Sequence, residues 1–172
     1  MKVKTLALLL PLFASSAFAA PLQLDVYNPQ EKGIFPVSST LVSGPKEAIL
    51  FDAQFSTKDG EQLVQMIRAS GKTLKAIVIT SGDPDFYFGL EPIQAAFPQA
   101  KIVATQQVID HILHTKDAKL AYWGPILGAQ APKTLIVPIY GLLPACKHVM
   151  VVGYRFDCSR ISGLLVRLMP WP

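Results

Sequence analysis

Cysteine is scarce in this sequence of 172 residues. Only Cys146 and Cys158 are present, and both lie after Gly141. They could pair in an oxidising compartment, but two cysteines are too few for a disulfide framework, and they do not form a Cys-x-x-Cys motif. The sequence therefore excludes a small domain that depends on several disulfides for its fold.

Clustered positive charge is missing from the body of the chain. The formal net charge is +4, but lysines near the N-terminus and basic residues after Gly141 supply it, so that residues 20–138 are close to neutral. A nucleic-acid surface needs clustered lysine and arginine with interleaved aromatic side chains. We therefore expect no nucleic-acid partner.

The N-terminal apolar run is too short to cross a membrane. Leu6–Phe13 falls below the ~20 residues that a span needs. Lys2 and Lys4 precede this run, and small residues ending at Ala19 follow it, which is the order of a secretory signal peptide. We expect cleavage after Ala19, a periplasmic or secreted protein, and no stable membrane span after cleavage; an uncleaved anchor is the alternative.

Residues 20–138 alternate between strand-like and helical patterns. Apolar and β-branched runs bounded by turn residues predict the strands, and apolar positions at helical spacing predict the helices. Such alternation is typical of an α/β layered domain. The expected strands are 22–27, 37–42, 47–51, 74–80 and 101–105, and the expected helices are 56–70, 90–97 and one that begins at 108.

The loop after the strand 74–80 carries the residues most suited to chemistry. In residues 81–89, Asp83 and Asp85 lie two positions apart. Carboxylates so spaced can hold a cation through oxygen, or one can orient a water while the other binds a metal. The ordinary alternative is that Asp83 begins a turn and Asp85 caps the next helix.

Several nearby residues have two interpretations. Phe86 and Tyr87 adjoin the carboxylates, so they are candidates to line a substrate pocket, or they belong to the core. His111 and His114 share a helical face and could hold a metal, but polar helix faces are usually just solvated, as we expect here. Asp52 ends a strand beside the loop and is expected to support it by hydrogen bonding. Gly124-Pro125 predicts a turn.

The order of these segments resembles the N-terminal half of the metallo-β-lactamase superfamily. The resemblance rests on the hairpin ending at residues 48–52, the strand 76–80 and the loop closing at Gly89. It implies a partial αββα layered sandwich. It also implies a loop of the pattern Thr-His-x-His-x-Asp-His, whose two spaced histidines bind one zinc and whose Asp-His pair binds a second.

When that pattern is aligned with this chain, Ser81 and Asp83 stand at the two spaced histidine positions. Asp85 stands at the aspartate position and Phe86 at the last histidine position. Only Asp85 matches. The resemblance implies zinc as the family's cofactor, Asp85 as the catalytic and metal-binding carboxylate, and Asp83 as a substitute metal ligand. Because the histidines are replaced, we expect a degenerate zinc site.

The resemblance predicts a hydrolase that opens an ester, amide or lactam bond of a small molecule. The alternative is a non-catalytic exported domain that binds a small molecule or a partner, which the missing histidines favour. The family's second half is not found in this sequence, and without it one sheet face is expected to be uncovered and apolar.

Composition changes after Gly141. The remaining residues contain no glutamate, one aspartate and three of the four arginines, without a clear helix or strand period. We expect residues 139–172 to form an atypical tail. Such a tail is either translated out of the original reading frame, in a truncated protein, or a genuine C-terminal extension.

Overall fold

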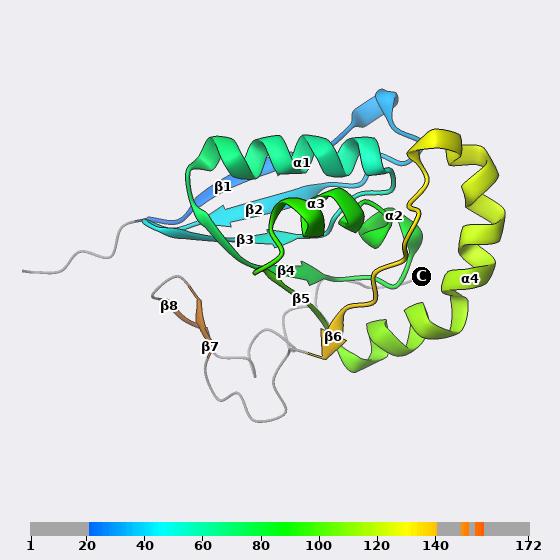
Figure 1. Cartoon of the computed structure of the whole chain (residues 1–172). Coiled ribbons are helices and arrows are strands. Elements are labelled where there is room, and N and C mark those ends of the chain that lie inside the picture. The colour runs from blue at the N-terminus through cyan, green and yellow to red at the C-terminus, as the bar shows by residue number, and fades with distance from the viewer. Residues whose placement is uncertain (1–20, 141–148, 152–153, 157–172) are drawn as a thin grey trace, which may run out of the picture.

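A computed structural model describes residues 21–140, 149–151 and 154–156 of the chain (Figure 1). The expected signal peptide, both cysteines and most of the tail lie outside the described residues. Within the tail, β7 (Val149–Val151) and β8 (Tyr154–Phe156) form a short antiparallel pair, which the sequence pattern did not predict. None of the described helices combines the length and the apolar character that crossing a bilayer requires.

A six-stranded sheet in the order β1-β2-β3-β4-β5-β6 forms the centre of the fold. Neighbouring strands from β1 to β3 are antiparallel, and those from β3 to β6 are parallel. The strands are β1 (Gln23–Tyr27), β2 (Ser39–Ser43), β3 (Glu47–Phe51), β4 (Thr73–Ile79), β5 (Lys101–Ala104) and β6 (Ile139–Tyr140).

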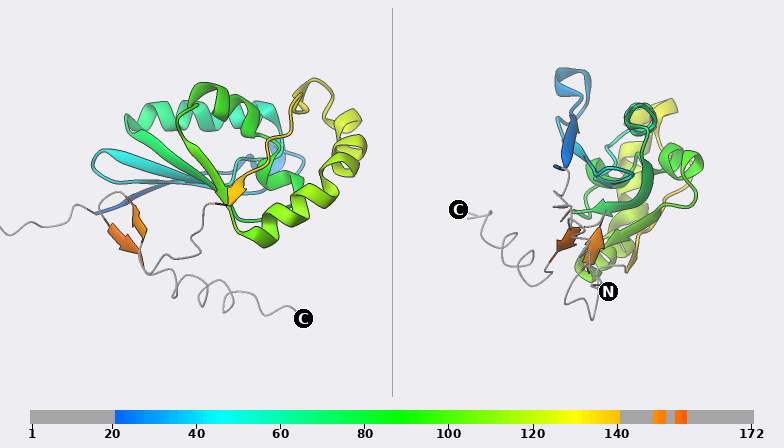
Figure 2. Two further views of the ribbon diagram at one scale, coloured as in Figure 1. Left: turned by 60° about the horizontal axis from the view of Figure 1, so that its bottom comes forward. Right: turned by 90° about the vertical axis from the view of Figure 1, so that its left-hand side faces the viewer.

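Helices make the crossovers that parallel neighbours require. They are α1 (Thr57–Ser70), the short α2 (Pro84–Tyr87), α3 (Leu90–Ala96) and α4 (Gln106–Leu127), with single 3₁₀ turns at Gln30–Lys32 and Gly128–Gln130. Figures 1 and 2 show α1 and α3 over one face of the sheet and α4 beyond the carboxyl end of β4. The expected α/β class is confirmed.

Local signals define α1 as the sequence predicts. The Ser56 hydroxyl accepts a hydrogen bond from the Asp59 backbone N–H at 3.0 Å, which caps the first turn. Gly71 ends the helix with φ of 65°, a left-handed conformation that favours glycine. Leu63 and Ile67 point into the core and are fully buried.

The expected turn at Gly124-Pro125 is wrong, because α4 continues to Leu127. Pro125 has no backbone N–H, so one helical hydrogen bond is lost there. That turn is held by packing: the Trp123 ring lies edge-on to Phe35 and Phe55, with both centroid distances 5.3 Å. Tertiary packing therefore overrides a local turn signal.

The two faces of the sheet differ. Leu41, Leu50, Ile77 and Ile102 are aligned across β2 to β5 on the face that the helices cover, and all four are buried. The opposite face is also apolar, and three of its side chains are exposed: Leu24 (64%), Val26 (62%) and Ile139 (58%). This is the face that the resemblance predicts to be uncovered.

Candidate functional site

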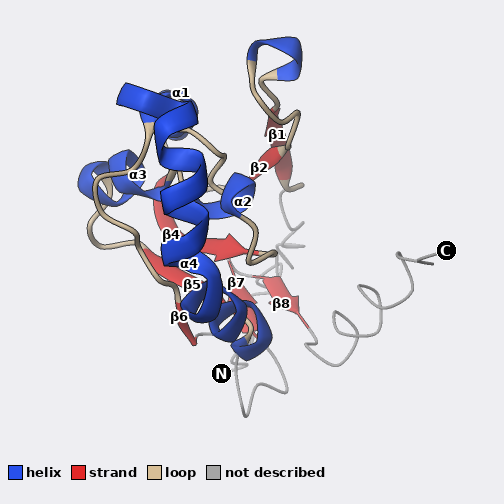
Figure 3. Cartoon of the chain, turned by 90° about the vertical axis from the view of Figure 1, so that its right-hand side faces the viewer, coloured by secondary structure: helices blue, strands red, loops and turns tan. Residues whose placement is uncertain are grey.

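The predicted loop lies at the carboxyl end of β4, where α2 and α4 come together in front of the strands (Figure 3). Carboxyl ends of parallel strands are the usual place for function in α/β folds. Residues from β3, β4, α2 and α4 meet there. The site is therefore built by segments that are far apart in the sequence.

Asp52 supports the loop, as predicted. Its carboxylate accepts hydrogen bonds from the Thr80 backbone N–H at 2.8 Å and from the Thr80 hydroxyl at 2.7 Å. Asp52 is buried, and burial raises the pKa of its carboxyl to about 6, although the Thr80 hydrogen bonds oppose the shift. The nearby charge of Asp85 raises this pKa further. Both carboxylate oxygens of Asp52 accept hydrogen bonds from Thr80, and Asp52 therefore holds the start of the loop in place.

Two glycines let the end of the loop pack against the rest of the domain. The Ala53 N–H donates to the Phe86 carbonyl at 2.7 Å. A Cβ on Gly89 would clash with the carbonyl oxygen of Ala53, and a Cβ on Gly60 of α1 would clash with the carbonyl oxygen of Gly89. Gly89 belongs to the resemblance, whereas Gly60 was not predicted; its position inside a helix pattern was the available signal.

Lys119 of α4 contacts the first half of the loop, and this residue was not predicted from the sequence. Its ammonium donates to the Gly82 carbonyl at 3.0 Å and to Asp83 Oδ1 at 2.9 Å. The same nitrogen lies 2.8 Å from His111 Nε2. The hydrogen bond from Lys119 lowers the pKa of the Asp83 carboxyl, although partial burial opposes the shift. Asp83 is therefore an ionised carboxylate that already has a cation beside it.

Asp85 lies in the first turn of α2 and is half-buried. Burial raises the pKa of its carboxyl, and the neighbouring Asp83 charge adds to the shift. Asp83, not Asp85, occupies the N-cap position of α2, and it makes no side-chain capping hydrogen bond. The capping role that we considered for Asp85 is therefore wrong.

Phe86 and Tyr87 pack against or within the core. Tyr87 is 1% exposed, its hydroxyl makes no hydrogen bond within the described residues, and burial raises its pKa to about 12. Phe86 is half-buried against the same core. Their role in lining a substrate pocket stays a prediction.

The two histidines of α4 make different contacts. His114 is exposed, and its Nδ1 lies 2.6 Å from the Asp110 carbonyl oxygen of the same helix, as expected of a surface residue. His111 instead faces the loop and Lys119. Its ring packs so closely on Gly82 that a Cβ at that position would overlap it.

The donor set of this loop does not fit zinc. A zinc site needs three or four nitrogen, sulfur or carboxylate ligands that converge on one point. Within residues 21–140 and the β7–β8 strands, no three side chains of histidine, cysteine, aspartate or glutamate are grouped in that way. Asp83 is in addition paired with Lys119. The loop keeps the aspartate of the pattern but not its ligand set.

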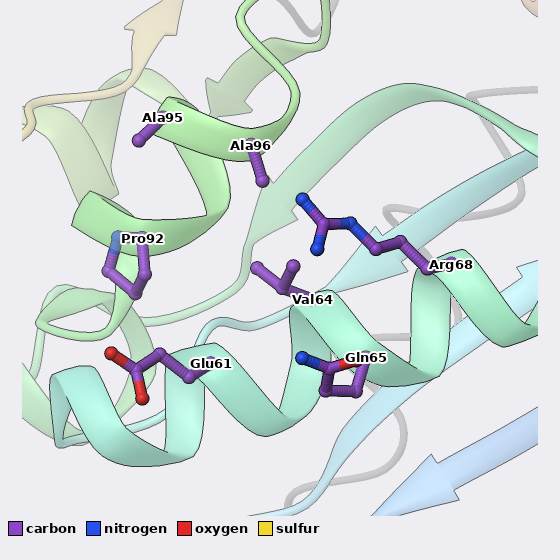
Figure 4. A pocket seen from close by; sticks show the side chains of 7 residues that line it. All are labelled: Glu61, Val64, Gln65, Arg68, Pro92, Ala95 and Ala96. Atoms are coloured by element: carbon purple, nitrogen blue, oxygen red, sulfur yellow. The ribbon is translucent and has the colours of Figure 1, made fainter.

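A separate hollow of about 440 Å³ lies on the outer side of α1 and α3 (Figure 4). Glu61 and Arg68 flank an apolar floor that includes Val64 and Ala96. It contains no residue of the loop at 80–89. The hollow is therefore distinct from the predicted site.

The fold is that of part of a metallo-β-lactamase. The chain is similar to the solved structure of the B3 metallo-beta-lactamase BLEG-1, with a TM-score of 0.52 and 17% sequence identity over 78% of this chain. The match covers 59% of BLEG-1, so this chain spans less than two thirds of that protein. The expected fold relationship is confirmed.

Other solved structures match over shorter stretches. They include the DIM-1 metallo-beta-lactamase exposed to ceftazidime, with a TM-score of 0.44, 21% identity and coverage of 58% of this chain and 49% of that one. A metallo-beta-lactamase from Hirschia baltica matches with a TM-score of 0.44, 11% identity and coverage of 55% and 43%. No family model and no curated protein matches the chain.

Proposed function

We propose that this protein is an exported, hydrolase-like member of the metallo-β-lactamase fold with a degenerate metal site. The observation that supports the proposal is which residues stand at the zinc-ligand positions of the loop. Asp85 stands at the aspartate of the zinc-binding pattern and is half-buried at the carboxyl end of β4. Ser81 and a lysine-paired Asp83 stand where the pattern has histidines.

Asp85 is the residue that carries any remaining hydrolysis. A carboxylate whose pKa is raised by burial accepts a proton more readily once it is ionised, which suits a group that orients and activates water. Its position in the first turn of α2 fixes the carboxylate at the edge of the loop. The substrate class is a small molecule with an activated ester, amide or lactam bond, by analogy with the fold.

Hydrolysis assays test this role directly. The full chain is assayed with chromogenic esters, lactones and cephalosporins, alongside Asp85→Asn and the control Asp117→Asn on the exposed side of α4. We expect Asp85→Asn to lose the turnover that wild type and Asp117→Asn retain. Equal rates in all three proteins would contradict the role of Asp85. No turnover in wild type would favour the non-catalytic binding domain.

Export is tested by the mass of the protein recovered from the periplasm or medium. Cleavage after Ala19 predicts a chain that begins at Ala20. A recovered chain that retains Met1, or one that stays with the membrane fraction, would contradict this part of the proposal.

We propose further that residues 139–172 differ in origin from the body, because their composition differs. The test is to resequence the coding DNA from the codon of Pro138 and to translate it in all three frames. A neighbouring frame that continues with strand and helix patterns and suitably spaced histidines would support a frameshift. No sensible continuation in another frame would indicate a genuine extension.

A further inference from the structure

Lys119 places a positive charge inside the loop that resembles a zinc-binding loop. Its ammonium lies 3.0 Å from the Gly82 carbonyl oxygen, 2.9 Å from Asp83 Oδ1 and 2.8 Å from His111 Nε2. We infer that this ammonium is a built-in cation, which takes the place of a metal ion in the loop. The inference deepens the proposed degenerate site and rests on it.

The surroundings of the Lys119 ammonium match its bonding capacity. A lysine ammonium has three N–H donors and no acceptor. Three acceptors of three kinds surround it: a backbone carbonyl, a carboxylate and an imidazole nitrogen. A hydrogen bond from Lys119 to His111 uses the ring tautomer that has its lone pair on Nε2. Carboxylate, carbonyl and imidazole are also the groups that proteins use to bind metal cations.

This arrangement contains more contacts than a single ion pair. The Asp83 and His111 side chains are 58% and 51% exposed, whereas Lys119 is 20% exposed and reaches from α4 to a loop 36 residues earlier. The absence of a Cβ at Gly82 allows His111 to pack onto the loop beside the ammonium. The Gly82 carbonyl, the Asp83 carboxylate and the His111 ring therefore all contact the Lys119 ammonium.

The Lys119 contacts therefore hold α4 against the loop without a bound metal ion. A metal ion on the Asp83 carboxylate would lie beside the Lys119 ammonium, whose positive charge repels it. Wild type should therefore neither need zinc nor respond to it. Removal of the lysine charge should loosen the loop, and zinc should not restore it, because only Asp83 and His111 are then left as side-chain ligands.

The experiment compares Lys119→Met, Lys119→Ala and the control Lys116→Met in the full chain. Lys116 lies on the same helix, but its ammonium pairs with the adjacent Asp117 instead of the loop. Thermal unfolding is followed with zinc alone and with a chelator, and zinc affinity is measured by competition with a chromogenic chelator. Asp83→Asn is made alone and in combination with Lys119→Ala, because it removes the carboxylate that pairs with the ammonium.

We expect Lys119→Met to lower the unfolding midpoint by about 4 °C in chelator, and Lys116→Met to leave it nearly unchanged. Added zinc should not restore the midpoint of Lys119→Ala. Asp83→Asn should lower the midpoint much less in Lys119→Ala than in wild type, because the ammonium that pairs with Asp83 is already gone.

Two results would overturn the inference. They are equal midpoints for the two methionine variants, and effects of Lys119→Ala and Asp83→Asn that simply add in the double variant. If Lys119→Ala does not fold, the Lys119→Met comparison in zinc and in chelator remains decisive. Tight zinc binding by wild type is a separate outcome, because it would contradict the proposed degenerate site itself.

Discussion

The carboxylate of Asp52 receives both hydrogen-bond donors of Thr80, the backbone N–H at 2.8 Å on Oδ1 and the hydroxyl at 2.7 Å on Oδ2. The pair joins the end of β3 to the end of β4, directly before the loop that carries Asp83 and Asp85. These two hydrogen bonds fix the position at which the loop begins. Because Asp52 is buried, the same pair also makes the stability of the domain depend on pH.

The first prediction concerns this pH dependence. Burial raises the pKa of Asp52 from 3.8 to about 6, so the folded protein holds a proton that the unfolded chain releases at lower pH. The contribution to stability is fully present below about pH 4 and is lost as the pH rises through about 6, with a change of up to ~3 kcal/mol. The upward pKa shift of Asp85 also makes the fold more stable at low pH, whereas the downward pKa shift of Asp83 makes it more stable at higher pH.

Asp52→Asn should flatten this part of the pH profile. An amide can accept from the Thr80 N–H and donate to the Thr80 hydroxyl, so both hydrogen bonds are kept without a buried charge. Urea unfolding between about pH 4 and 7 measures the effect, with the exposed Asp110→Asn as the control. An Asp52→Asn profile as steep as that of wild type would show that Asp52 is not the group responsible.

The second prediction concerns Gly60. Alanine in a helix is usually better than glycine by about 1 kcal/mol, but a Cβ here would collide with the Gly89 carbonyl oxygen, which belongs to rigid backbone. We expect Gly60→Ala to destabilise the domain by about 1–3 kcal/mol.

Gly124→Ala is the matched control for Gly60→Ala. Gly124 also lies within a helix, and the nearest atom to its added Cβ is Leu120 Cδ1 at 3.8 Å, an ordinary contact. Gly124→Ala should therefore stabilise by up to about 1 kcal/mol. Denaturant unfolding measures both variants, and the account fails if the two changes have the same sign.

The third prediction concerns the exposed apolar face of the sheet. Leu24 and Val26 project from the edge strand β1, and apolar exposure on an edge strand promotes association. Val26→Lys should reduce concentration-dependent association in light scattering. Tyr122→Lys removes an equally exposed ring from α4 (66%) and should have little effect. Equal effects of the two substitutions would mean that the sheet face has no special role.

Features encoded by neighbouring residues were predictable from the sequence. Ser56 and Gly71 mark the ends of α1, and the apolar run of β4 predicts a buried strand before the loop. These signals depend on hydrogen bonds and periodicities within a few residues. They place Asp83 and Asp85 correctly at the carboxyl end of β4.

Features that depend on distant contacts were not predictable. The length of α4 depends on Trp123 packing against Phe35 and Phe55, which overrides the Gly-Pro signal. The partnership of Lys119 with Asp83 depends in turn on that long helix crossing the end of the sheet (Figure 3). From the sequence alone, Lys119 is one of two lysines in this helix, and nothing distinguishes it from Lys116.

Zinc stoichiometry of the purified protein tests the central claim most directly. The protein is loaded with excess zinc, dialysed, and analysed for bound metal, and its thermal midpoint is compared with and without zinc. We predict no stoichiometric zinc and no change in the midpoint, because Asp83 is paired with the Lys119 ammonium and the histidines of the pattern are replaced. Retention of one or more zinc ions per chain, with a raised midpoint, would contradict the account.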